Sequence, residues 1–234
     1  GTNQSFVTAV FRGVSLDLPG AADGLVGWGD YDNDGRLDML LSGYIPTQVW
    51  SNTGIGFSNI NANLPYISVE TACWVDFDND GRLDIGSAGG NWRNTGSNYA
   101  AADTVPFSNY YASAMWSDFN NDGLADMAFF GYEDTDPAIQ IWLNFGNRLL
   151  NGNYPFPAVY FGTVASADFD GDGLMDLSLA GSALSYPATN LVHVWRNTGK
   201  DFVLADSSIS GIQFGSLALL LHGLATLALD DTAL

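Results

Sequence analysis

The sequence predicts an all-β protein built from repeated units, because two landmarks recur at a constant phase. An aspartate pattern, Asp-Xaa-Asp/Asn-Xaa-Asp-Gly-Xaa-Xaa-Asp, occurs four times, and a second pattern, Trp-Xaa-Asn-Xaa-Gly, follows each copy at 50–54, 92–96, 142–146 and 195–199. The 27 glycines and 13% aromatic residues are typical of many short strands joined by tight turns. Helix signals are scarce.

Each aspartate pattern predicts a calcium loop within a β-hairpin. Alternate carboxylates on a tight turn point at a common centre, the glycine at the sixth position permits the turn, and hard oxygen donors suit calcium. An EF-hand loop begins in the same way but needs a helix on each side and a glutamate at the twelfth position. Here the twelfth positions are Leu41, Ser87, Phe129 and Leu179, and short apolar runs of strand character follow the loops.

Four calcium sites are expected, with oxygen ligands from the side chains of the first, third, fifth and ninth residues and from the main-chain carbonyl of the seventh. The predicted ligands are Asp30, Asp32, Asp34, Arg36, Asp38, Asp76, Asp78, Asp80, Arg82, Asp84, Asp118, Asn120, Asp122, Leu124, Asp126, Asp168, Asp170, Asp172, Leu174 and Asp176. Asn120 removes one charge from the third loop, so we expect that site to be the weakest.

The spacing of the loops predicts the four-stranded blades of a β-propeller. Successive first aspartates lie 46, 42 and 50 residues apart, a period typical of a solenoid or of a propeller of four-stranded blades. In each unit the first strand ends in the metal loop, a second strand such as 38–43 follows, the third contains the tryptophan motif, and the fourth resembles 57–64. A further tryptophan lies two residues before the first aspartate of three loops, at Trp28, Trp74 and Trp116, and Ser166 takes this place in the fourth unit. These three and the four motif tryptophans are all the tryptophans of the chain, and we expect them to pack between blades.

We interpret 1–234 as one propeller domain with units at 19–65, 66–110, 111–158 and 159–210. A degenerate fifth unit at 211–234 is expected to be closed by an N-terminal strand at 6–18. This fifth unit is expected to bind no metal, because apolar residues, His222 and Thr226 stand where oxygen donors are needed. The alternative is a fragment of a seven-bladed ring, which would need roughly 300 residues or more.

The aspartate loops, the glycine after the second strand and Phe161-Gly162 ahead of the fourth loop resemble FG-GAP and VCBS repeats. These are the calcium-loop blades of integrin α-subunit heads and of many secreted bacterial and fungal proteins. The resemblance covers about 27–199 and implies a calcium-bound β-propeller that serves in adhesion, glycan binding or the anchoring of larger assemblies. The fold does not decide among these roles.

Composition restricts the partners. The net charge is −19, but 15 of the 26 acidic residues lie in the four loops, so the acidity belongs mainly to the metal sites. Seven Lys and Arg do not form the basic surface that nucleic acid requires. The most apolar stretch, 217–229, is shorter than the roughly 20 residues of a membrane span.

Cys73 is the single cysteine, so no disulfide forms within the chain, and we interpret it as a buried apolar side chain.

The sequence predicts a secreted or cell-surface protein that is not an enzyme. Loops that need abundant calcium suit an extracellular setting, and Asn3 begins a formal glycosylation motif. His193 and His222 lie in no catalytic motif, and calcium enclosed in such a loop offers no open coordination position.

Two functions stay open at this point. The first is an adhesion or recognition module for an extracellular protein or glycan, in which variable loops between second and third strands hold a sugar. The residues expected there are Tyr44, Tyr132, Glu133, Asp134, Asp136 and Tyr186, although ordinary hairpin tips have the same composition. The second is a building block of an extracellular filament, coat or appendage, in which neighbouring chains are the partners.

Overall fold

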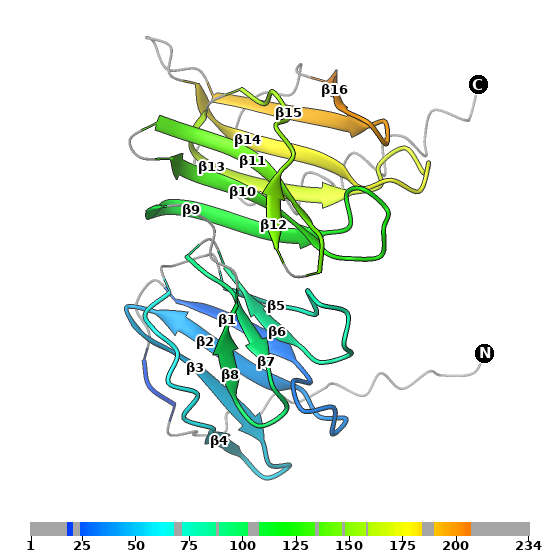
Figure 1. The fold of residues 1–234 in the computed structure, drawn as a ribbon. Coiled ribbons are helices and arrows are strands. Elements are labelled where there is room, and N and C mark those ends of the chain that lie inside the picture. Colours follow the sequence, from blue (N-terminus) through cyan, green and yellow to red (C-terminus); the bar gives the residue numbers. More distant parts are fainter. Residues whose placement is uncertain are drawn as a thin grey trace, which may run out of the picture.

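Sixteen strands and no helix make up the part of the chain that the computed structural model describes, which is 18–20, 24–67, 72–87, 89–102, 108–133, 136–146, 148–157, 159–183 and 190–206. The strands form four separate sheets of four antiparallel strands (Figure 1). In each sheet, strands that are consecutive in the sequence are neighbours. The predicted all-β, four-stranded units are therefore confirmed.

The bounds of the sheets follow the two landmarks. The strands are β1 (Leu25–Gly29), β2 (Asp38–Gly43), β3 (Ile45–Asn52) and β4 (Phe57–Asn59) in the first sheet; β5 (Cys73–Val75), β6 (Asp84–Gly86), β7 (Trp92–Asn94) and β8 (Tyr99–Ala101) in the second; β9 (Ser108–Ser117), β10 (Asp126–Glu133), β11 (Asp136–Asn144) and β12 (Leu149–Asn151) in the third; and β13 (Val159–Ala167), β14 (Asp176–Ala183), β15 (Asn190–Asn197) and β16 (Phe202–Asp206) in the fourth.

The second strand of the first sheet has its predicted bounds, whereas the fourth strand is shorter than the predicted 57–64. Asn61 and Asn63 both have a φ of 54°, and a left-handed backbone cannot continue an extended strand. Asparagine tolerates this conformation better than most residues, so the sequence 61–63 contained the signal for an earlier end.

Neighbouring sheets share their hydrophobic cores. One cluster joins the first and second sheets and includes Leu40, Val49 and Ile85, and another joins the third and fourth sheets and includes Phe130 and Leu177. The first strands also lie together, since β1 contacts β5 and β9 contacts β13. Full burial of one such side chain contributes about 1.5–3 kcal/mol, so the apolar strands hold the sheets against each other as blades.

Tryptophans bridge neighbouring blades where a glycine leaves room. The indole N–H of Trp74 donates to the Gly27 carbonyl at 3.3 Å, and a Cβ atom at Gly29 would lie 2.7 Å from the same ring. Trp116 packs in the same manner on Gly86. Trp28 differs: it is 56% exposed and contacts Phe57 of its own sheet. The blade expected to cover Trp28, built from 6–18 and 211–234, lies outside the described residues apart from Leu18, so packing between blades stays a prediction for Trp28.

Three expectations concern segments outside the described residues: the closing strand at 6–18 (all but its last residue), the degenerate unit at 211–234 with His222, and the motif at Asn3. Cys73, predicted as a buried side chain, is half-buried by its exposed surface and carries a free thiol, whose pKa desolvation raises to about 12. Among the described residues, no helix has the length and apolar character needed to cross a membrane.

Candidate metal centre

Each aspartate loop is a tight turn between the first and second strands of its sheet. The glycines at the sixth position have φ values of 83° to 88°, and the fourth positions, Asn33, Asn79, Asn121 and Gly171, are also left-handed, with φ of 57° to 75°. Glycine has no steric penalty in this region and asparagine has a small one. The requirement at the fourth position escaped the sequence analysis, although the recurring Asn or Gly there was a usable signal.

The first aspartate of each loop organises the turn from within. In the first loop, Oδ1 of Asp30 accepts the Asp34 amide at 2.9 Å and Oδ2 accepts the Gly35 amide at 2.8 Å. The same pair of hydrogen bonds recurs at Asp76, Asp118 and Asp168. A carboxylate oxygen has two lone pairs, so each of these oxygens retains capacity for a metal ion.

The ninth aspartate of each loop is buried. In the second loop, Asp84 accepts the Phe77 amide at 3.2 Å on one oxygen and the Asn94 amide at 2.7 Å on the other. Burial raises the pKa of Asp84 to about 7 and that of Asp126 to about 6, and it also raises the pKa of Asp38 and Asp176. Desolvation disfavours the charged form of a carboxylate, and a bound cation would offset this cost.

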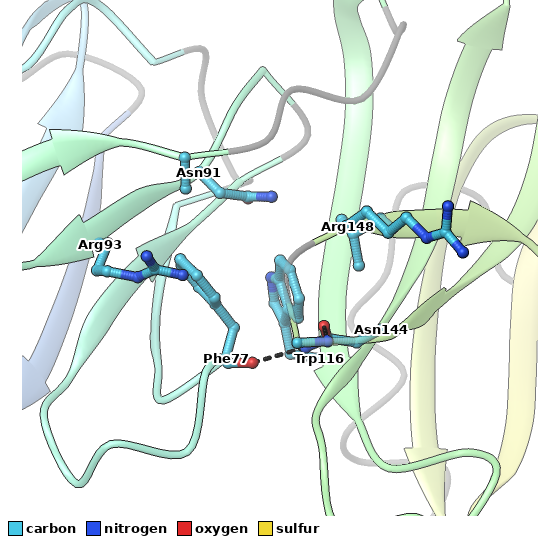
Figure 2. Close-up of a pocket in the computed structure, with 9 residues that line it drawn as sticks. Phe77, Asn91, Arg93, Trp116, Asn144 and Arg148 are labelled. Carbon is cyan, nitrogen blue, oxygen red and sulfur yellow. Dashed lines mark hydrogen bonds between the residues drawn. The ribbon is translucent and has the colours of Figure 1, made fainter.

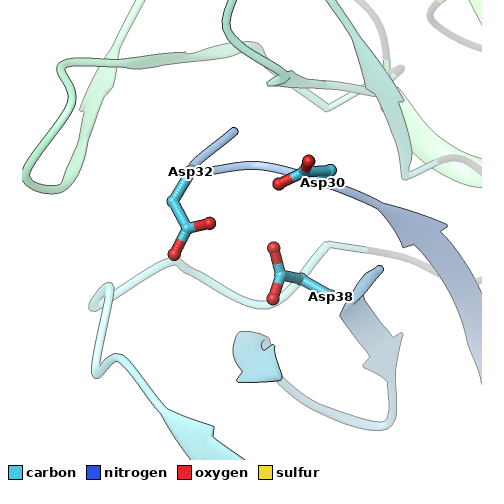
Figure 3. A group of neighbouring side chains, drawn as sticks. All are labelled: Asp30, Asp32 and Asp38. Atoms are coloured by element: carbon cyan, nitrogen blue, oxygen red, sulfur yellow. The ribbon is translucent and has the colours of Figure 1, made fainter. Parts of the chain in front are cut away.

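The structure brings the first, third and ninth carboxylates of three loops together. In each of these groups the oxygens lie within 4.8 Å of one another: Asp30, Asp32 and Asp38 (Figure 3), then Asp76, Asp78 and Asp84, then Asp168, Asp170 and Asp176. A donor set made of oxygen alone suits calcium and does not match the nitrogen and sulfur ligands of structural zinc. These residues therefore fit a calcium ion.

The third loop lacks one carboxylate. Asn120 stands at its third position, where its Nδ2 donates to Asp122 Oδ2 at 2.9 Å and its Oδ1 accepts the Asp122 amide at 3.0 Å. The described residues therefore contain three groups of three carboxylates, while the third loop has an amide in place of one. Its expected weakness stays a prediction.

The fifth aspartates are not part of these groups of carboxylates. Each accepts the amide of the seventh residue of its loop at 2.9 Å. In the first two loops the other oxygen forms an ion pair with Arg36 or Arg82. The expected ligand roles of Asp34, Asp80, Asp122 and Asp172, and of the carbonyls of Arg36, Arg82, Leu124 and Leu174, stay predictions.

The asparagine of the tryptophan motif is a structural residue that the sequence analysis missed. Its Nδ2 donates to a main-chain carbonyl in the aspartate loop of the preceding blade, at the second residue of that loop. The bonds run from Asn94 to Tyr31 at 2.8 Å, from Asn144 to Phe77 at 2.6 Å (Figure 2) and from Asn197 to Phe119 at 2.7 Å. All three asparagines are 2–3% exposed. The signal was the strict recurrence of this asparagine beside the tryptophan.

The second residue of each loop also carries the aromatic contact between blades. Tyr31 stacks on Trp74 with ring centroids 6.3 Å apart, and Phe77 stacks on Trp116 at 6.0 Å. The fourth sheet has Ser166 in place of the tryptophan, and there Phe119 meets Phe202 edge-on at 6.0 Å. In the first three loops, the residue between the first and third positions therefore contacts the next blade.

Two surface features could contact a ligand. Tyr44 and Tyr66 are 64% and 46% exposed, and their rings lie 6.3 Å apart and 25° from parallel. A groove opens between the second and third sheets, lined by Phe77, Asn91, Arg93, Ala102, Trp116, Asn144, Gly146, Arg148 and Leu149 (Figure 2). The side chains of Tyr132, Glu133 and Asp136, and the residues Asp134 and Tyr186, lie outside the described part.

Four-stranded sheets with an acidic loop after each first strand define a β-propeller-like protein with candidate metal sites. A model of the FG-GAP-like repeat matches residues 30–87 and 118–179, just over half of the chain. The chain therefore belongs to the FG-GAP-like repeat family.

Two solved structures have a similar fold. The first is an Agrocybe aegerita lectin whose structure concerns recognition of non-reducing terminal N-acetylglucosamine; the TM-score is 0.51 and the identity 19%, over 82% of this chain and 53% of the lectin. The second is the V. cholerae biofilm matrix protein Bap1, with a TM-score of 0.50 and 17% identity over 80% of this chain and 29% of Bap1. This chain thus spans about half of the lectin. A search of curated proteins gave no match.

Proposed function

We propose that this chain is a calcium-stabilised, extracellular β-propeller module that recognises a glycan and catalyses no reaction. The observation that carries the proposal is the exposed, stacked pair of Tyr44 and Tyr66. An exposed aromatic ring can stack on the apolar face of a sugar at little desolvation cost, and the phenol hydroxyl supplies a hydrogen bond. The structural likeness to a lectin supports this choice of ligand class.

The tyrosine pair lies at the end of the sheet opposite to the metal loop. Tyr44 follows the second strand, whereas the loop precedes it, and Tyr66 contacts Tyr44. Binding a glycan at this end leaves the metal loop undisturbed. Calcium is therefore assigned a structural role here: it joins two strands and, through the second loop residue, the next blade.

A glycan array probed with the full chain in calcium tests the proposal, with a chelator-treated sample beside it. We expect calcium-dependent binding to a defined sugar class, and loss of that binding in Tyr44→Ala and Tyr66→Ala. Phe145→Ala is the matched control, because Phe145 is also an exposed aromatic, at 51%, but lies in the turn after β11 near a metal loop. A blank array from folded, calcium-loaded protein would refute the glycan proposal.

A second function, as a building block of an extracellular assembly, is favoured by the exposed apolar surface of β1. Val26 is 51% exposed and Trp28 56% exposed on this strand, and an exposed apolar patch on a sheet favours contact with another chain. Sedimentation velocity at rising concentration separates the two functions. Self-association that Trp28→Ser abolishes would support assembly, whereas a monomer that binds a glycan would support recognition alone.

A further inference from the structure

In the described part of the chain, four arginines form ion pairs with loop carboxylates. Arg36 and Arg82 belong to the loops themselves and pair with the fifth aspartate. Arg93 and Arg196 are different, because they come from β7 and β15 and pair with the third aspartate. That third carboxylate belongs to the group of oxygens that fits a calcium ion.

Arg93 lies beside its carboxylate as a close charge pair, in which the Nε–H makes no hydrogen bond with the described residues. Its Nε lies 2.5 Å from Asp78 Oδ2, and its guanidinium lies 5.9 Å from the centre of the Phe77 ring. The Asp78 side chain is 13% exposed, and its Oδ1 is buried with no hydrogen-bond partner among the described residues. One oxygen of this carboxylate thus faces a cation, whereas the other is buried without a hydrogen-bond donor from the described residues.

Arg196 repeats the arrangement in the fourth loop. Its Nε lies 2.8 Å from Asp170 Oδ2, and its Nη2 lies 3.6 Å from Asp172 Oδ2. Both arginines occupy the second place of the motif Trp-Xaa-Asn-Xaa-Gly, so the same strand position delivers both charges. The corresponding residues beside the first and third loops are Ser51 and Leu143, which carry no charge. The chain therefore contains loops with and without this arginine.

Three carboxylates within 4.8 Å repel one another when no cation lies between them. A guanidinium beside the third carboxylate reduces this repulsion. A bound metal ion would remove the repulsion more completely, but it would draw on the same carboxylate and would be repelled by the nearby guanidinium. The arginine and the metal ion consequently compete for the third aspartate.

We propose that Arg93 and Arg196 are internal counter-cations of the second and fourth loops, which stabilise the metal-free loop and weaken its binding of calcium. The proposal rests on the calcium binding proposed above. These two loops should therefore bind calcium more weakly than they would without the arginines. They should also lose less stability when the calcium ion dissociates.

The test uses the full chain with Arg93→Met or Arg196→Met, which keep the aliphatic length and remove the charge. Arg148→Met is the matched control, because it changes the net charge equally but Arg148 lies over Phe145 at 6.0 Å, where it pairs with an aromatic ring. Calcium affinity is read site by site from the amide resonances of Gly81 and Gly173, which donate to the first aspartates of the two loops. Melting is measured in chelator and in calcium.

We expect each variant to bind calcium about two- to fivefold more tightly at its own loop, as loss of a partly exposed ion pair implies. We also expect the metal-free melting temperature to fall by about 1–4 °C, while Arg148→Met changes neither. Unchanged calcium affinity in both variants would overturn the proposal, because the arginines would then not compete with the metal ion. Weaker affinity would overturn it too, because the arginines would then orient the ligands. A wild-type chain that binds calcium at no loop would overturn both this proposal and the calcium-stabilised module.

Discussion

Asn144→Ala should destabilise the protein more than the same substitution at Asn52, because Asn144 joins two blades and Asn52 bonds within its own sheet. The Asn144 amide donates to Phe77 O at 2.6 Å and to Ala125 O at 2.9 Å, and its Oδ1 accepts the Gly146 amide at 2.8 Å. Asn52 keeps only the bonds within its own sheet, to Leu37 O at 3.0 Å and from Gly54 N at 2.9 Å.

The expected magnitude follows from these bonds. Each buried hydrogen bond contributes about 1 kcal/mol, so Asn144→Ala removes about 3 kcal/mol. Asn52 is only half-buried and water replaces part of its bonding, so its substitution costs about 1–2 kcal/mol. The difference of about 1–2 kcal/mol measures the bond between blades and its burial.

Urea unfolding in saturating calcium, followed by tryptophan fluorescence and circular dichroism, measures both losses, provided that the two probes agree. Equal destabilisation by the two substitutions would refute the reasoning, because it would mean that the bond from Asn144 to the Phe77 carbonyl adds nothing to the stability of the fold.

Three further predictions concern packing, pH and metal affinity. Gly29→Ala should cost about 1–3 kcal/mol in urea unfolding, because the new Cβ would meet Trp74 at 2.7 Å; Gly56→Ala, whose Cβ would have nothing within 4 Å, is the control, and equal losses would contradict the close approach. Burial lowers the pKa of His193, so the unfolded chain binds more protons than the native one below its ordinary value of 6.5. The stability of the wild type should therefore fall relative to His193→Leu as the pH is lowered from 8 to 5.5 in matched thermal melts, and a constant difference would argue against a neutral, half-buried imidazole. Asn120→Asp should tighten calcium binding at the third loop, seen at the Gly123 amide resonance, whereas a wild-type third loop that already binds most tightly would contradict the assigned role of charge.

Much of the fold was predictable because its signals are local. The second strand at 38–43 follows from an apolar run bounded by a glycine, and β2 has these bounds with every residue buried. The end of β4 at Asn59 was missed, since it depends on the left-handed backbone of Asn61 and Asn63 rather than on hydrophobicity.

The candidate site divides in the same way. The sequence by itself determined the turn of each loop, because the first aspartate and the sixth glycine act within six residues of each other. Only the tertiary structure decided that the ninth aspartate is buried and accepts an amide of the third strand, since this depends on how that strand packs beside the loop.

The joints between blades also required the tertiary structure. Asn144 bonds to a residue 67 positions earlier, and its acceptor is a main-chain carbonyl, a group that every residue carries and that leaves no mark in the sequence. The arginines beside the second and fourth loops are a related case: their charge is visible in the sequence, but their partner carboxylates are reached only when the third strand packs beside the loop.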